Sequence, residues 1–80
     1  SEGRIYVLDA QAQEIKVYTP QGVYESTIAQ RGSGPGELTG AGFLVMGPGD
    51  TLVVPDVNNR RVNLFLTDGT SLGSFPVTLE

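Results

Sequence analysis

The sequence predicts an all-β protein built from two similar sheet modules in tandem. Short runs rich in Val, Ile, Leu and aromatic residues alternate with turn-forming Gly, Pro, Asn and Asp along the 80 residues. No window keeps apolar residues at helical spacing for three turns, and Gly or Pro interrupts too often for a helix. A shift of 47 positions places residues 4–22 on residues 51–69 without a gap, which indicates an internal repeat.

The first module is predicted to contain three strands. Residues 4–9 carry apolar side chains on both faces, and residues 14–19 place Ile15 and Val17 on one face. A turn follows, in which Pro20 presets its own φ and Gly22 is free to take a positive φ. Residues 23–29 then form a third, more polar strand, as suits an outer edge exposed to solvent.

A glycine-rich stretch, residues 30–42, separates this module from the second. Residues 43–46 are a continuous apolar run, which predicts a strand covered on both sides. Residues 51–54 form the next strand, with Pro55 expected as its last residue or at a bulge, because proline cannot donate to a ladder. Residues 61–66 and 71–77 complete a module of four strands.

Similar residues recur at matching positions of the two modules. Val7 and Val54, Asp9 and Asp56, and Gly22 and Gly69 are identical pairs; apolar character is kept at Ile5 and Leu52, Ile15 and Val62, Val17 and Leu64, and Tyr18 and Phe65. Self-similarity at about 40–50 residues, with several strands per unit, is typical of propeller blades or stacked β-units. The pattern rather than the few identities indicates this architecture.

The second module resembles an NHL-type β-propeller blade. The family pattern is Asp, two loosely specified residues, Asn, any residue, Arg and then an apolar-polar-apolar-aromatic strand. It falls on Asp56, Asn59, Arg61, Val62, Leu64 and Phe65. The glycine-rich run at residues 32–38 looks like the link between neighbouring blades of six-bladed bacterial propellers, and residues 43–45 look like the innermost strand of the next blade.

The resemblance implies one unit over residues 1–80 with two antiparallel blades. Residues 4–29 would be a partial first blade, residues 30–42 the link and residues 43–77 the second blade. In the first blade, Ala12 and Glu14 replace the expected Asn and Arg. This blade also lacks its inner strand, so the sequence predicts seven strands where two complete four-stranded blades need eight.

Propellers have about four to eight blades, so two blades cannot close a ring. Three alternatives follow. The chain is an excised or designed piece of a longer propeller, or several copies assemble into a ring, three chains giving six blades. Alternatively, it is an open two-sheet unit whose exposed edges pair with a second molecule. Unpaired edges and a bare blade face favour a homo-oligomer, or further blades of a parent chain, over a monomer.

The polar residues of the motif are predicted to be structural. Asp9, Asp56 and Asn59 are turn formers whose side chains accept backbone hydrogen bonds, and Arg61 can pair with a carboxylate or carbonyl. We therefore expect a structural turn motif rather than a ligand site, with Asn59 at a turn position. Arg31 and Arg60 are predicted surface contacts.

Other candidate sites have simpler explanations. Residues 32–36 lack the Lys-Ser/Thr ending of a phosphate-binding loop and precede no helix, which favours a flexible connector. The acids that suggest calcium recur at turn positions without EF-hand spacing: Asp9, Asp50, Asp56 and Asp68. The aromatic residues are assigned to blade packing: Tyr6, Tyr18, Tyr24, Phe43, Phe65 and Phe75.

Composition excludes several classes of function. The chain has no Cys and no His, so we expect no catalytic, cofactor-binding or metal residue, and an NHL-like lyase would need histidine ligands. The net charge of −4 and the scattered basic residues argue against nucleic acid. No apolar run approaches the roughly 20 residues of a membrane span, and the start of the chain has no export signal.

The sequence therefore predicts a non-catalytic structural or interaction module, either a propeller fragment or a self-assembling blade pair. Its mechanism would be passive, with rigid sheets presenting variable loops to a partner. The alternative is a ligand- or peptide-binding segment of an extracytoplasmic bacterial propeller sensor. Binding of a saccharide, a peptide or calcium through Arg31, Arg60 or the Asp residues would favour that alternative.

Overall fold

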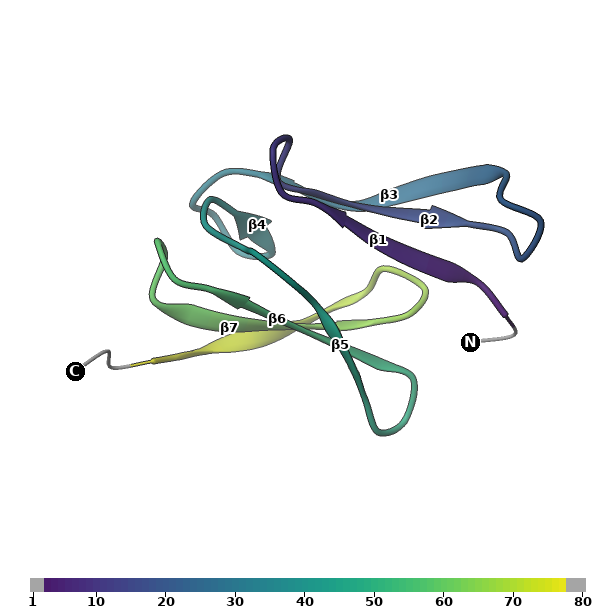
Figure 1. Ribbon diagram of the computed structural model, residues 1–80. Helices are drawn as coiled ribbons and strands as arrows, with labels where there is room; N and C mark the ends of the chain where they lie inside the picture. Colours follow the sequence, from purple (N-terminus) through teal and green to yellow (C-terminus); the bar gives the residue numbers. More distant parts are fainter. Residues whose placement is uncertain (1–2, 78–80) are drawn as a thin grey trace.

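A computed structural model of the chain describes residues 3–77, which form two four-stranded sheets stacked one over the other (Figure 1). The first sheet has the order β1-β2-β3-β4. Its strands are β1 (Ile5–Asp9), β2 (Glu14–Tyr18), β3 (Tyr24–Arg31) and β4 (Glu37–Leu38). The first three strands are antiparallel, whereas β4 runs parallel to β3.

The second sheet has the order β5-β6-β7-β8 and is antiparallel throughout. Its strands are β5 (Val45–Gly47), β6 (Thr51–Asp56), β7 (Arg61–Leu66) and β8 (Ser71–Pro76). No helix occurs in residues 3–77, so the all-β prediction is confirmed. It follows that this part of the chain also has no helix long and apolar enough to cross a membrane.

Both sheets use the same turn geometry at repeat-equivalent positions. Three pairs of residues, each separated by 47 positions, adopt a positive φ: Gly3 (79°) and Asp50 (58°), Gln13 (57°) and Arg60 (55°), and Gly22 (88°) and Gly69 (97°). Only three non-glycine residues in the described chain have a positive φ, and each belongs to one of these pairs. A backbone that L-residues rarely adopt is thus reproduced in both modules, which identifies them as structural repeats.

The predicted strand count of seven is wrong, because the link contains an eighth strand. Residues 37 and 38 pair with Gln30 and Arg31, which extends β3 two residues past its predicted end at Ala29. This short strand lies at the outer edge of the first sheet, so the inner side of β1 remains unpaired among the described residues. The pairing depends on a loop that returns the chain alongside β3, which local sequence does not encode.

The inner strand of the second sheet begins later than predicted. Residues 43–46 were expected to form it, but pairing starts at Val45 opposite Val53 and ends at Gly47 opposite Thr51. The preceding chain still runs along β6, since Ala41 makes an isolated antiparallel bridge to Asp56, the last residue of that strand. This bridge is one residue out of register with the β5–β6 ladder, so residues 42–44 between the two remain unpaired. The run is also not covered on both sides, since Phe43, Val45 and Met46 are 58%, 47% and 51% exposed.

Pro55 lies one residue before the end of β6, opposite Val62, rather than at its last position. Because β5 pairs only as far as Val53, Pro55 lies beyond the end of that ladder. A missing N–H therefore removes no hydrogen bond to the inner strand.

The core lies between the two sheets. Alternate residues of β1, β2 and β3 face the second sheet, and alternate residues of β6 and β7 face the first. The buried cluster comprises Ile15, Ala29, Leu38, Ala41, Leu52, Val54 and Phe65, with Tyr6, Leu8, Ile28 and Leu44 packed against it. Two of these residues, Leu38 and Ala41, come from the link, so the link is part of the core.

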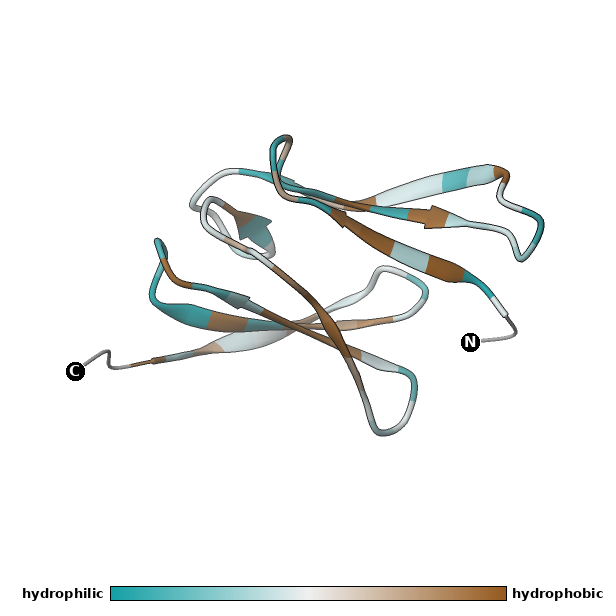
Figure 2. Ribbon diagram, viewed as in Figure 1, coloured by the Kyte–Doolittle hydropathy of each residue, from teal (hydrophilic) through white to brown (hydrophobic). Residues whose placement is uncertain are grey.

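Each sheet also has a face that no described residue covers. On the second sheet this face is apolar and includes Val45, Val53, Val62, Leu64 and Phe75, which follow one another across the strand register. On the first sheet it includes Ile5 and Val7 among polar residues (Figure 2). Tyr24 and Phe75 are 54% and 49% exposed, and Tyr18 lies opposite Ile5 on the open face of the first sheet. Of the aromatic residues assigned to packing, these three and Phe43 therefore lie outside the core.

Candidate functional site

The most densely hydrogen-bonded part of the structure is where the link, residues 30–42, meets the ends of β6 and β2. Asp56 ends β6, and its side chain is 1% exposed. Its carboxylate accepts hydrogen bonds from the backbone N–H of Thr39 at 2.9 Å and of Gly40 at 2.8 Å. It also accepts the N–H and side-chain amide of Asn59, at 3.2 and 3.0 Å. One buried carboxylate therefore ties two segments together.

Asn59 and Arg61 bind the carbonyl groups of the same link. Asn59 lies in the turn at residues 57–60, and its amide donates to the carbonyl of Gly32 at 3.3 Å. Arg61 opens β7, and its Nη2 donates to the carbonyls of Gly34 at 2.6 Å and Glu37 at 2.8 Å. Because a guanidinium presents several donors in a fixed plane, one side chain can fix two turns of a loop.

Gln13 holds the link from the first sheet and was not singled out in the sequence. It is 4% exposed; its Nε2 donates to the carbonyl of Ala41 and its Oε1 accepts the N–H of Ala41, both at 2.9 Å. The sequence offered one signal for it, since Gln13 occupies the repeat position of Arg60. We call Gln13, Asp56, Asn59 and Arg61 the link clamp.

In the glycine-rich loop, the backbone N–H groups of two glycines donate hydrogen bonds to acceptors within the link itself. Glu37 accepts the N–H of Gly34 at 2.9 Å, and the N–H of Gly32 donates to the carbonyl of Leu38 at 2.9 Å. The hydrogen bond from Gly34, followed by one from Gln30, lowers the pKa of Glu37. The carboxylate of Glu37 thus occupies the place that an anion would need, which agrees with a connector rather than a phosphate site.

Asp56 stays ionised despite its position. Burial raises its pKa, but the hydrogen bonds from the N–H groups of Thr39, Asn59 and Gly40 outweigh this effect and lower the pKa overall. The negative charge is therefore stabilised by backbone dipoles, which bind the ionised form more strongly than the neutral one.

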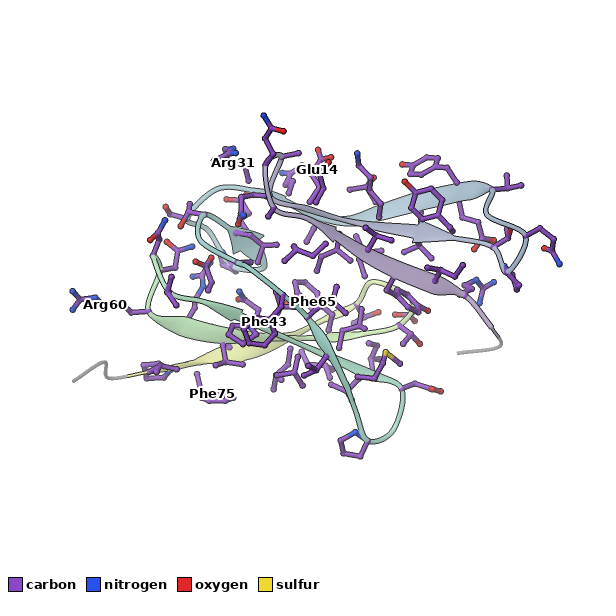
Figure 3. The ribbon with its side chains drawn as sticks, in the orientation of Figure 1. Glu14, Arg31, Phe43, Arg60, Phe65 and Phe75 are labelled. Carbon is purple, nitrogen blue, oxygen red and sulfur yellow. The ribbon has the colours of Figure 1, made fainter. Side chains whose placement is uncertain are left out.

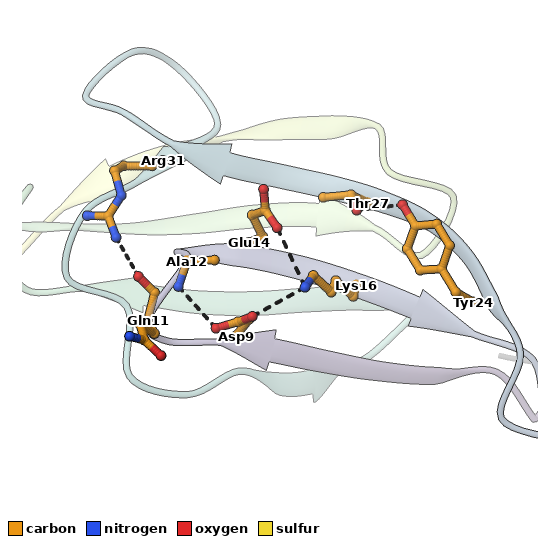
Figure 4. A network of polar contacts seen from close by, with 8 residues as sticks. All are labelled: Asp9, Gln11, Ala12, Glu14, Lys16, Tyr24, Thr27 and Arg31. Atoms are coloured by element: carbon orange, nitrogen blue, oxygen red, sulfur yellow. Dashed lines mark hydrogen bonds and ion pairs between the residues drawn. The ribbon is translucent and has the colours of Figure 1, made fainter.

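Asp9, the repeat counterpart of Asp56, lies on the open face of the first sheet (Figure 4). It accepts the N–H of Ala12 at 3.0 Å and the ammonium of Lys16 at 3.3 Å. These two interactions, the N–H of Ala12 first, lower its pKa, and the hydrogen bond to Asp9 raises the pKa of Lys16. Lys16 also lies 3.8 Å from Glu14, the residue that stands where the second module has Arg61.

Arg31 and Arg60 lie at different places on the surface (Figure 3). Arg31 donates to the carbonyl of Gln11 and so ties the end of β3 to the turn before β2. The guanidinium of Arg60 makes no hydrogen bond or ion pair with any residue between 3 and 77 and borders a hollow of about 260 Å³. The structure does not bring the two residues together.

The four Asp residues proposed for calcium do not form a cluster. In the part of the chain that the structure describes, no group of three or more His, Cys, Asp or Glu side chains could hold a metal ion. Asp9 and Asp56 end strands, whereas Asp50 and Asp68 lie in turns. The N–H and hydroxyl of Thr70 lower the pKa of Asp68, which therefore also binds its own turn.

The chemistry available to the link clamp is recognition of a peptide backbone. Its carboxylate and amide oxygens accept N–H groups, and its guanidinium and amide nitrogens bind carbonyls, over residues 32–41. Glycine at position 40 is required by this approach, because a Cβ there would lie 2.8 Å from the backbone nitrogen of Asn58. The clamp therefore binds a glycine-containing segment of bends and turns, in which residues 37 and 38 form the short strand β4.

Comparisons with known proteins agree with this architecture. A crystal structure of a protein from Bacteroides fragilis NCTC 9343 that is predicted to be exported superposes with a TM-score of 0.86 at 21% identity. The match covers 98% of this chain but 23% of that one, so the chain spans about a quarter of the length of its structural relative. No curated protein matches the sequence. A family described as a 6-bladed beta-propeller matches residues 1–71, and the chain therefore belongs to this family of six-bladed β-propellers.

Proposed function

We propose that this chain is a structural and interaction module: two blades of a propeller that join further blades, either of a parent chain or of other copies. The single observation that carries the proposal is the apolar open face of the second sheet, where Val45 and Phe75 are about half exposed. An apolar face of this kind on a small domain marks an interaction surface.

The repeat indicates how the two open faces fit together. The inner face of the second sheet carries Leu52, Val54 and Phe65, and the residues 47 positions earlier are Ile5, Val7 and Tyr18 on the open face of the first sheet. Conversely, Ile15 on the inner face of the first sheet corresponds to Val62 on the open face of the second. The open faces are thus the two halves of one inter-blade interface, which supports a head-to-tail contact.

We further propose that the blades are of the NHL type and have no catalytic role. The Asp-Asn-Arg spacing supports the first point, because all three side chains bind the link as a unit. The absence of a catalytic role is supported by the contacts of these three side chains, which bind backbone atoms rather than point into a cavity. Turnover that survives chelation and rigorous purification would contradict it.

The solution mass of the chain tests the self-assembly version. Light scattering after size exclusion is expected to give more than one chain per particle, and Phe75→Glu is expected to return it to a monomer. Ile5→Glu, on the other open face, should do the same. A strict monomer at all concentrations would eliminate self-assembly and leave only joining to blades of a parent chain.

Mixing the two variants distinguishes head-to-tail from symmetric contact. In a head-to-tail assembly each variant keeps one intact face, so an equimolar mixture of Ile5→Glu and Phe75→Glu forms a dimer although neither does alone. A symmetric contact through the second sheet would instead let Ile5→Glu dimerise by itself. Gln21→Glu, in an exposed turn, adds the same charge away from both faces and serves as the control.

A second candidate function is ligand or peptide binding in an extracytoplasmic propeller. The hollow beside Arg60 favours it, and the structural relative from Bacteroides fragilis is predicted to be exported. Titration with saccharide, peptide and calcium panels tests this candidate. Binding that disappears in Arg60→Ala but persists in Arg31→Ala would support it, whereas no binding from any panel would oppose it.

A further inference from the structure

The hollow beside Arg60 lies at the end of the second sheet and has a volume of about 260 Å³. Its apolar wall is formed by Phe43, Pro55, Val57, Val62 and Val77. Its lining also includes Asp56, Arg60 and Arg61, and no described residue fills it. The equivalent position in the first module indicates what this hollow binds.

Residues 47 positions earlier form the corresponding place on the first sheet. Pro55, Val57, Arg60, Val62 and Val77 correspond to Leu8, Ala10, Gln13, Ile15 and Gln30. In the first sheet this groove is occupied by the link. Gln13 binds both backbone groups of Ala41, Gln30 pairs with Glu37 of β4, and Leu38 packs in the same buried cluster as Ile15.

We infer that the hollow is a binding groove for a glycine-containing peptide segment of the kind that residues 36–41 provide. A leucine of that segment fills the space next to Val62, and its backbone passes Arg60 beside the open edge of β8. The occupant is the link of a further propeller blade. This inference rests on the proposed propeller role for the identity of the occupant, but on the repeat alone for the groove.

One difference between the two grooves sets the preference of the second. Gln13 both donates to and accepts from Ala41, whereas a guanidinium has donors only. Arg60 can therefore bind a carbonyl or a carboxylate of the occupant but not its N–H. The backbone itself is the same, since φ is 57° at Gln13 and 55° at Arg60, so glutamine at position 60 adds no strain beyond that of arginine.

A peptide with the sequence of residues 30–42 tests the groove. It is titrated into the isotope-labelled 80-residue chain, and amide shifts are followed by NMR, which detects millimolar binding. We expect saturable shifts at Val57, Arg60, Val62 and Val77. A peptide in which Leu38→Asp replaces the anchoring side chain is expected to give none.

Arg60→Gln is expected to increase the affinity for the peptide, which a surface that binds peptides non-specifically would not show. Restoring one acceptor adds about one net hydrogen bond, so the peptide should bind about fivefold more tightly. Arg31→Gln makes the same charge change away from the groove and should leave the affinity unchanged. Equal affinities in Arg60→Gln and the unmodified chain would overturn the inference.

Two further outcomes would also overturn it. Peptide shifts confined to Gln13, Ile15 and Ala29 would mean that the peptide only replaces the chain's own link. Shifts at Val62 and Val77 that depend on protein concentration, and not on peptide, would assign the hollow to a second copy of the chain. The solution mass tests the proposed function independently of this inference. A chain that is monomeric but binds the peptide would refute self-assembly and still support the groove.

Discussion

Replacing Asp56 by Asn tests whether the link clamp stabilises the pair of blades. The change preserves the shape of the side chain but leaves one oxygen instead of two. Asp56 accepts four hydrogen bonds, two at each oxygen, and three come from backbone N–H groups. In the variant, two of the four donors face an NH₂ group that cannot accept them.

The cost follows from these lost bonds. A hydrogen bond to an ionised group contributes about 1.5–3 kcal/mol, so two lost bonds at the lower value destabilise the fold by about 3 kcal/mol. The total stability of a small domain is only about 5–15 kcal/mol. With a urea m-value of about 1 kcal/mol/M for a chain of this size, the midpoint should fall by about 3 M.

Urea unfolding followed by circular dichroism measures this shift, and Asp9→Asn is the matched control. Asp9 has the same repeat position but is partly exposed and binds one backbone N–H and Lys16, so its replacement should move the midpoint much less. Equal shifts of the midpoint for the two variants would refute a stabilising role of the clamp. They would show that the buried Asp56, with its hydrogen bonds from the link, contributes no more to stability than the partly exposed Asp9.

The pH dependence of the same variant gives an independent check. The folded-state pKa of Asp56 lies below its ordinary value of 3.8, so its contribution is present above pH 3.8 and is lost as the pH falls through the lower, folded-state pKa. The stability difference between the unmodified chain and Asp56→Asn should therefore shrink only below pH 3.8. A difference that stays constant down to pH 2 would contradict this.

Three further substitutions test the surroundings of the clamp. Gly40→Ala places a Cβ 2.8 Å from the backbone nitrogen of Asn58 and should lower the free energy of unfolding in urea by about 2 kcal/mol. Gly42→Ala is the control, because a Cβ there would have nothing within 4 Å, and it should change the free energy of unfolding by less than about 0.5 kcal/mol. Arg61→Lys loses the planar fork that joins two carbonyls and should cost about 1 kcal/mol, so an unchanged midpoint would rule out that role. Asn63 is 1% exposed with no hydrogen-bond partner for its amide among residues 3–77, so Asn63→Leu should raise the melting temperature by about 5 °C; a lower melting temperature would refute this.

The sequence by itself determined the all-β class, the repeat and most of the strands. Local patterns are sufficient for these features, because alternation and turn residues act within a few positions of the chain. The 47-residue repeat also predicted matching turns, and the left-handed pair of Gly22 and Gly69 follows directly from glycine at both places.

Only the tertiary structure decided which side chains are buried and which groups meet. Gln13 and Ala41 are 28 residues apart, and no local pattern connects a polar turn residue with a link amide. The strand β4 and the late start of β5 have the same origin, since both depend on how the link is held between the sheets. Phe65 and Phe75 read alike in the sequence, but Phe65 is 1% exposed and Phe75 49%, because burial of a strand residue depends on which face another sheet covers.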